Sequence, residues 1–235
     1  MKLTLIFGGV LLAGMASATV FDLKTDFSTT VNPNGAWRYG SEGGTVTGTT
    51  LAPGTFTLNT FSTSMFGGLY TGWTDTASDT TANTAGAVAK SNTATVTGVA
   101  VGDIVLHGAP SNASTLRFAV VRWTAPTAGT ITSLTGTFGA GDTGNADVFV
   151  FNGATQLFGV TNSSANQNFS FTNIAVTAGQ TFDFIVGSPS ANPTNNNGNS
   201  TPTTATFNFQ PVPEPTSIAA LGLGAIALLR RRNRK

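Results

Sequence analysis

Between Thr19 and Pro211, short apolar runs alternate with polar positions, and no stretch repeats apolar residues at helical spacing. The apolar positions are rich in β-branched and aromatic residues, a composition and alternation typical of half-buried strands. Gly, Asn and Pro separate these runs and favour turns there. Strands about every 8–12 residues with turn residues between them predict an all-β fold, an antiparallel β-sandwich or jelly roll.

Two short segments mark turns of this expected sandwich. Asn152-Gly153 is the strongest short hairpin signal, because both residue types tolerate the positive φ of a two-residue hairpin turn. Ala52-Pro53-Gly54 predicts a second turn, since Pro restricts φ and Gly can take a positive φ. The predicted strands are Thr45–Leu51, Thr55–Phe61, Thr93–Ala100, Asp103–His107, Leu116–Thr124, Thr130–Phe138, Asp147–Phe151, Thr155–Val160, Asn168–Val176, Thr181–Val186 and Ala205–Phe209.

Two polar stretches, Thr74–Ala87 and Ser188–Pro202, lack this alternation. The second is rich in Asn, Pro and Ser and contains few apolar side chains to bury. We expect both to be loops of one sandwich domain over residues 19–211, in which residues 188–211 form a low-complexity loop and the last strand. Each is either a plain connection or a functional loop, because binding groups often lie on long loops of a rigid sandwich.

The first 18 residues have the pattern of a secretory signal peptide. Lys2 precedes the apolar run Leu3–Met15, and Ala16-Ser17-Ala18 forms an A-x-A cleavage site. We therefore expect an N-terminal signal helix over residues 1–18, cleavage by signal peptidase after Ala18, and export of the protein.

The last 24 residues contain a second targeting pattern. Val212-Pro213-Glu214-Pro215 precedes the uncharged run Ser217–Leu229, which has 13 residues. That length is short of the roughly 18–20 residues that span a bilayer as a helix. The basic residues beyond it are expected to stay on the cytoplasmic side. The pattern predicts a short apolar helix that holds the chain in the membrane until processing, with a permanent anchor as the alternative. The basic cluster is Arg230, Arg231, Arg232, Arg234 and Lys235.

In this order, the Pro-Glu-Pro tripeptide, the apolar run and the basic cluster resemble a PEP-CTERM sorting signal over residues 212–235. The resemblance implies that the tail is recognised by exosortase, a membrane cysteine transpeptidase of bacteria that make exopolysaccharide. It implies export to the cell surface, the outer membrane or the extracellular matrix.

The middle of the chain carries a looser resemblance. Asn32–Gly40 (NPNGAWRYG) and Val121–Pro126 (VRWTAP) are similar to segments of a domain found in exported proteins of planctomycetes and their relatives. Asp147–Gly153 and Val176–Val186 continue the similarity in order. It implies a β-sandwich of the lectin-like or carbohydrate-binding type. The chain departs from that pattern at Gly108, where Pro is usual after His107, and at Asn199, where Asp is usual.

Charge and cysteine content exclude several classes of function. Residues 19–211 contain five basic and nine acidic side chains, a net charge of −4. Nucleic-acid binding needs a basic face or stripe, so we exclude it. Without cysteine, the exported chain has no disulfides, no thiolate zinc site and no cysteine nucleophile.

Catalytic motifs are missing as well. His107 is the only histidine, and neither a G-x-S-x-G nor an H-E-x-x-H segment occurs. Glycoside hydrolysis requires two carboxylates about 5–9.5 Å apart. Of the two glutamates, Glu214 belongs to the sorting pattern and only Glu42 remains. We expect a protein that is not an enzyme, with a matrix glycoside hydrolase as the less favoured alternative.

Two sets of residues are candidates for binding. Trp37, Tyr39 and Trp73 are aromatic side chains that can stack on sugar rings, and Trp73, beside a polar stretch, is the one expected to be exposed. Packing in the core is the commoner fate of such residues, and we expect it for Trp123, inside an apolar strand.

The second set is Asp142, Asn145 and Asp147, which place three oxygen-bearing side chains within six residues. Calcium takes six to eight oxygen ligands, often from such loops. A plain turn, in which Asp and Asn bond to their own backbone, is the favoured alternative. We therefore expect no cofactor, with a weak structural calcium site as the alternative.

These features together predict an exported bacterial protein of the cell surface or extracellular matrix, processed by exosortase. Its expected role is structural or adhesive, in association with exopolysaccharide or biofilm. The expected partners are signal peptidase, exosortase, the membrane before processing, and exopolysaccharide. A carbohydrate-binding module with an aromatic sugar platform is the alternative.

Overall fold

The computed structural model describes residues 17–112 and 114–212, and within them it confirms the all-β prediction. The first sheet follows the order β14-β11-β16-β9-β8-β7-β6, with β1 paired to β16 beside this path. All its strand pairs are antiparallel. Its strands are β1 (Thr19–Asp22), β6 (Phe61–Met65), β7 (Tyr70–Thr74), β8 (Ala87–Ser91), β9 (Ile104–His107), β11 (Gly129–Phe138), β14 (Gln167–Val176) and β16 (Thr201–Pro211).

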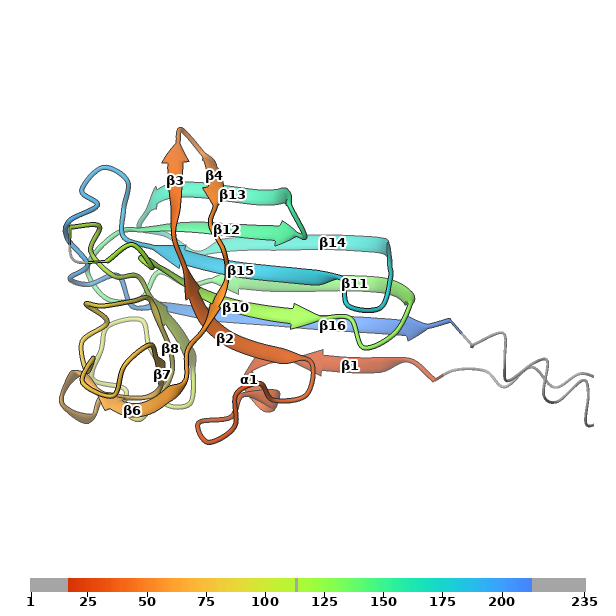
Figure 1. The fold of residues 1–235 in the computed structure, drawn as a ribbon, viewed down its shortest axis with the longest axis horizontal. Helices are drawn as coiled ribbons and strands as arrows, with labels where there is room; N and C mark the ends of the chain where they lie inside the picture. The colour runs from red at the N-terminus through yellow and green to blue at the C-terminus, as the bar shows by residue number, and fades with distance from the viewer. Residues whose placement is uncertain (1–16, 113, 213–235) are drawn as a thin grey trace, which may run out of the picture.

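The second sheet is also antiparallel and follows the order β13-β12-β15-β10-β2-β5. A separate hairpin of β3 (Gly44–Thr47) and β4 (Thr50–Pro53) projects from it (Figure 1). Two short helical pieces, α1 (Leu23–Asp26) and a 3-10 turn at Phe66–Gly68, complete the described chain. The strands of the second sheet are β2 (Trp37–Glu42), β5 (Thr57–Leu58), β10 (Phe118–Thr124), β12 (Ala146–Asn152), β13 (Thr155–Ser163) and β15 (Thr181–Gly187).

The two sheets pack face to face over one aromatic core. Along β16, buried Ala205, Phe207 and Phe209 alternate with more exposed residues, as expected of a strand with one face toward the core. Phe207 stacks on Trp123 of the opposite sheet, with ring centroids 4.3 Å apart and planes 18° apart. Burying one such side chain contributes about 1.5–3 kcal/mol to stability. Trp123 is fully buried, as its apolar strand predicted.

The second sheet is covered on its outer face too. Phe118, Phe149 and Ile185 form a smaller apolar cluster there, together with Leu51 from the β3–β4 hairpin. This is why β10, β12 and β15 read as nearly continuous apolar runs: side chains on both of their faces are buried.

Two sequence predictions are wrong: the turn of this hairpin and one strand of the first half of the chain. The turn lies at residues 48–49, within the predicted strand Thr45–Leu51, because Thr47 pairs with Thr50 and Gly48 takes φ +60°. Ala52 and Pro53 belong to β4 instead. Residues 93–100 form no strand. They form a loop whose Val99 is buried against the outer face of the first sheet, in a cluster with Tyr70 and Val105.

Both ends of the described chain lie at the same end of the sandwich, which we call the terminal end (Figure 1). Thr19 of β1 pairs with Phe209 of β16, and the Val212 amide donates to the Ala128 carbonyl at 3.0 Å. The loops over residues 139–145 and 188–200 lie at the opposite end, which we call the loop end.

The predicted signal helix, the C-terminal apolar helix and the basic cluster fall on residues 1–16 and 213–235, outside the described residues. Within the described ranges, none of the helices has the length and apolar character needed to cross a membrane.

Candidate functional site

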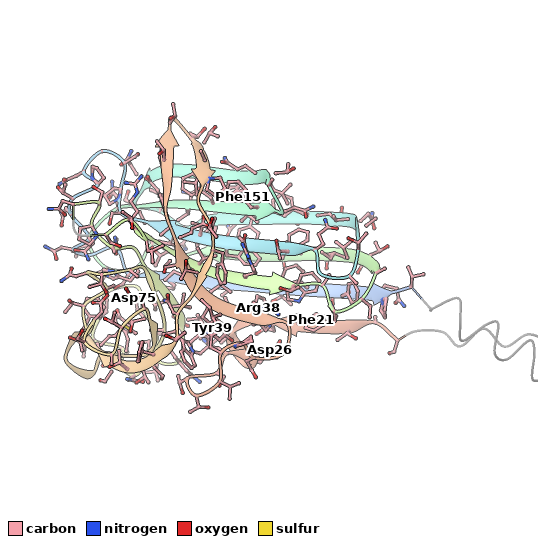
Figure 2. The ribbon with its side chains drawn as sticks, viewed as in Figure 1. Phe21, Asp26, Arg38, Tyr39, Asp75 and Phe151 are labelled. Carbon is pink, nitrogen blue, oxygen red and sulfur yellow. The ribbon has the colours of Figure 1, made fainter. Side chains whose placement is uncertain are left out.

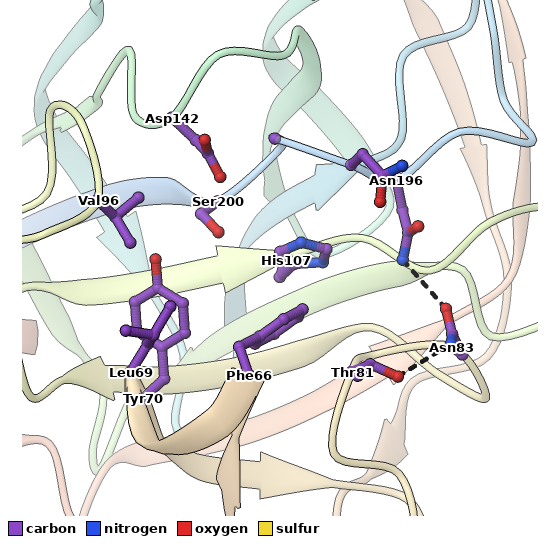
Figure 3. Close-up of a pocket in the computed structure, with 12 residues that line it drawn as sticks. Phe66, Leu69, Tyr70, Thr81, Asn83, Val96, His107, Asp142, Asn196 and Ser200 are labelled. Carbon is purple, nitrogen blue, oxygen red and sulfur yellow. Dashed lines mark hydrogen bonds between the residues drawn. The ribbon is translucent and has the colours of Figure 1, made fainter.

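A pocket of about 360 Å³ lies at the loop end, between the β6–β7 turn, the 75–86 loop and residues 196–200 (Figure 3). Its exposed rim residues Thr81, Asn83 and Asn197 connect it to the surface. Phe66, Leu69 and Val96 form an apolar side. The polar side chains that line it further in include His107, Asp142, Asn196 and Ser200, and no Lys or Arg is among its lining residues in the described chain.

His107, the last residue of β9, is 6% exposed and lies beside Phe66, with ring centroids 4.8 Å apart. Burial lowers the pKa of His107 to about 4, against smaller opposing effects of the Gly108 carbonyl and the Asp79 charge. The ring is therefore neutral at pH 7. Its Nδ1 lies 3.0 Å from the Gly108 carbonyl oxygen. Because a carbonyl only accepts, Nδ1 carries the proton and Nε2 remains an acceptor.

Gly108, directly after His107, lies where two backbones approach closely. A Cβ atom at this position would lie 2.5 Å from the Ser188 backbone nitrogen. The close approach of these two backbones leaves no space for a side chain. It also places the Gly108 carbonyl 3.4 Å from the Asn199 side-chain amide, which donates to it.

Tyr70, at the start of β7, carries the most informative polar atom of the pocket. The residue is 3% exposed, and its hydroxyl lies next to Ser200 without a well-formed hydrogen bond to any described group. Figure 3 shows this hydroxyl directed into the pocket between Val96 and Ser200. A buried hydroxyl without a partner costs about 1–3 kcal/mol, so such groups usually meet a water or a ligand.

Asp79 organises the loop that forms one wall of the pocket. Its carboxylate accepts hydrogen bonds from the backbone amides of Asn83 and Thr84, each at 2.9 Å, and from the Thr84 hydroxyl at 2.8 Å. Burial favours a higher pKa, but these hydrogen bonds outweigh it and hold the pKa of Asp79 below its ordinary value. The ionised form of Asp79 thereby fixes the backbone around Asn83.

Hydrogen bonds between loops hold the remaining walls. The Asn196 amide donates to Asn83 Oδ1 at 3.4 Å, and Asn83 donates to Thr81 Oγ1 at 2.9 Å (Figure 3). The Gly144 amide donates to the Gly198 carbonyl at 2.8 Å. Loops far apart in the sequence therefore meet at one preformed site.

The three aromatic residues predicted to stack on sugars lie in the core. Trp37, Tyr39 and Trp73 are 1%, 0% and 5% exposed. Trp37 Nε1 donates to Asp26 Oδ2 at 3.0 Å, and Tyr39 packs in the same region (Figure 2). Trp73 Nε1 donates to the Ser28 carbonyl at 2.7 Å. The expectation that Trp73 is exposed is wrong, because its ring packs in the main core cluster, and these rings offer no surface platform.

The residues of the alternative calcium site have different partners in the structure. Asp147 is 1% exposed, and its carboxylate accepts from the Asn162 amide at 2.8 Å. Asn145 donates to the Asn162 carbonyl at 3.0 Å, whereas Asp142 lines the pocket. Among residues 17–112 and 114–212, no group of three His, Cys, Asp or Glu side chains is arranged to hold a metal ion.

A buried charged cluster was not predicted. Arg122 and Asp183, on neighbouring strands β10 and β15, form a two-point ion pair with distances of 2.6 and 2.8 Å. Phe56 covers the guanidinium at 4.2 Å. Glu42 lies nearby, 1% exposed, and its Oε1 has no hydrogen-bond partner in the described chain. The only sign of this cluster in the sequence was that Arg122 and Asp183 each lie inside an apolar run. A charge inside a buried strand normally has a partner of opposite charge.

Residues 211–235 match the family model described as the PEP-CTERM protein-sorting motif. The chain carries a PEP-CTERM sorting motif. The motif indicates an exported, exosortase-processed protein of the cell surface or extracellular space. No curated protein matches the chain. Of the predicted motif residues, Val212 is described and 58% exposed, whereas Pro213, Glu214 and Pro215 lie outside the described residues. Of the predicted signal-cleavage residues, Ala18 is described and exposed, and Ala16 is outside.

Proposed function

We propose that this exported protein has a non-catalytic, structural or adhesive role in association with exopolysaccharide. The observation that carries the proposal is the position of the PEP-CTERM motif relative to the pocket. The motif begins at the terminal end, directly after β16, and the pocket lies at the loop end. A protein held at the surface through its sorted end would direct the pocket outward.

The composition of the pocket supports a non-catalytic role. Asp142 is the one carboxylate among its lining residues in the described chain. Glycoside hydrolysis uses two carboxyl groups on either side of the scissile bond. Glu42 and Asp183 do not line the pocket: both are buried, and Asp183 pairs with the half-buried Arg122.

A carbohydrate-binding module is the second candidate. Because the tryptophans are buried, they cannot form the aromatic sugar platform that this hypothesis first assumed. The pocket favours it for a different reason, because Phe66 and several hydrogen-bonding side chains line one small site. A lectin-like domain, as implied by the planctomycete-type resemblance, would place its ligand there.

The test is carried out in an exosortase-containing bacterium that makes exopolysaccharide. The wild-type chain is compared with Glu214→Ala for its location and for the mass of its C-terminus. We expect wild-type protein without its Arg-rich tail in the matrix fraction, and Glu214→Ala retained in the membrane.

A polysaccharide-deficient strain provides the control for the proposed role. There, wild-type protein should be processed normally but lost to the medium. Equal retention with and without polysaccharide would contradict the proposed association.

A further inference from the structure

We propose that the pocket at the loop end binds one uncharged hexose unit of a polysaccharide. The proposal rests on the proposed function for the source of the sugar. Its evidence, however, is the pocket itself: its size, the chemistry of its walls, and the buried Tyr70 hydroxyl, which makes no well-formed hydrogen bond to a described group.

The pocket is large enough to hold a sugar ring. The pocket has about 360 Å³, close to the lower end of the roughly 300–1,000 Å³ found for ligand pockets. The apolar side formed by Phe66 and Leu69 matches the C–H face of a hexose, which packs against apolar and aromatic surface. A longer glycan would extend past the exposed rim at Asn83 and Asn197.

The polar walls match a ring of hydroxyl groups. A sugar hydroxyl both donates and accepts, so it needs acceptors as well as donors around it. His107 Nε2 and the Asp142 carboxylate are acceptors, and the amide of Asn196 offers both functions. The hydroxyl of Tyr70 is directed into the same space, next to Ser200 but without a well-formed hydrogen bond. A ligand hydroxyl near it would remove the cost of this unpaired group.

Charge selects against acidic sugars. The pocket contains the Asp142 carboxylate but no Lys or Arg among its described lining residues. A uronate, sulfate or phosphate group would enter beside a like charge without a counter-charge, which is unfavourable in a partly buried site. We therefore assign the pocket to a neutral hexose.

The experiment measures monosaccharide binding to the exported, processed protein by NMR titration or calorimetry. The probes are glucose, galactose, mannose and N-acetylglucosamine, with glucuronate and galacturonate as the charged comparison. We expect saturable binding of at least one neutral sugar with a Kd on the order of 1 mM. Each uronate should bind at least about tenfold more weakly, and Asp142→Asn should reduce that difference.

Tyr70→Phe tests the location, with Tyr39→Phe as the matched control, because the two tyrosines are the only ones in the chain. Loss of the Tyr70 hydroxyl should weaken sugar binding about three- to tenfold with little change in Tm, since the hydroxyl makes no well-formed hydrogen bond in the free protein. The Tyr39 hydroxyl donates to the Asp26 carbonyl at 3.4 Å, away from the pocket, and its loss should leave Kd unchanged.

The outcomes separate the two proposals. If the protein binds exopolysaccharide but no neutral monosaccharide up to about 50 mM, the pocket assignment is overturned and the proposed function remains. Equal effects of the two Tyr→Phe changes, or tighter binding of a uronate, would also overturn it. Saturable sugar binding with equal matrix retention in the polysaccharide-deficient strain would instead overturn the proposed function alone.

Discussion

Glu42 shows, at the scale of a single residue, how burial changes chemistry. Burial desolvates its carboxyl group, and the nearby Asp183 charge adds to this effect, against a smaller opposing effect of Arg122. Together they raise the pKa of Glu42 to about 8. The folded protein therefore holds a proton at Glu42 at pH 7, where an exposed glutamate would be ionised.

This raised pKa predicts a pH-dependent stability. The unfolded chain releases the Glu42 proton near pH 4.5, and the folded protein releases it near pH 8. The contribution of Glu42 to the free energy of unfolding is thus complete below pH 4.5 and is lost as pH rises toward 8. At about 1.4 kcal/mol per pKa unit, the loss approaches 5 kcal/mol.

Glu42→Gln keeps the shape of the side chain and removes the titration. Between pH 5 and pH 8, we expect the free energy of unfolding of the wild type to fall by several kcal/mol more than that of the variant. Denaturant unfolding at the two pH values measures this difference. Parallel changes in both proteins would contradict a buried, protonated Glu42.

At the scale of elements, the 75–86 loop depends on one buried carboxylate rather than on secondary structure. Asp79→Asn replaces one acceptor oxygen with an amide that faces the N–H donors of the loop. Losing charge-assisted hydrogen bonds and opposing donors should cost about 2–4 kcal/mol and increase hydrogen exchange over residues 79–85. Asp75→Asn is the control, because Asp75 shares the Thr84 hydroxyl with Asp79 but accepts from none of the backbone amides described in this loop. Equal exchange in the two variants would show that Asp79 does not organise the loop.

The sequence predicted most strands of the second half of the chain but fewer in the first half. Strands β11 to β16 show alternation or long apolar runs, and their turn residues lie between them. Strand β2 has little alternation and includes Gly40, where a Cβ would lie 2.3 Å from the Thr57 carbonyl oxygen. Such a strand is stabilised by its neighbours, so its own residues carry only a weak signal.

At the scale of the whole molecule, the shared position of the two chain ends predicts an orientation at the cell surface. Ala191 is exposed in the 188–200 loop, and Ala128 is exposed at the terminal end, where its carbonyl accepts from Val212. The chain has no cysteine, so one substituted cysteine gives a single site for labelling.

Ala191→Cys and Ala128→Cys should react at similar rates with a bulky maleimide in the purified protein, because both positions are exposed. On intact cells that retain the protein, we expect several-fold faster labelling at position 191, since the terminal end would face the envelope or its attachment. Equal rates on cells would contradict display through the sorted end.

The sequence by itself determined the destination of this protein and its fold class. Sorting motifs are read as short linear segments. The destination could therefore be predicted from Pro213-Glu214-Pro215, the apolar run and the basic cluster. Alternation and turn residues are local features as well, and they were sufficient to predict the fold class.

Only the tertiary structure decided where a ligand could bind. The sequence singled out Trp73 as the ring expected to be exposed, but the core buries Trp73 together with Trp37 and Trp123. The pocket joins Phe66, His107 and Ser200, which lie on separate strands and loops. Its chemistry depends on distances between segments far apart in the chain, and burial at those distances also sets the pKa of His107 and of Glu42. No local pattern records such distances, because they exist only after the two sheets have packed.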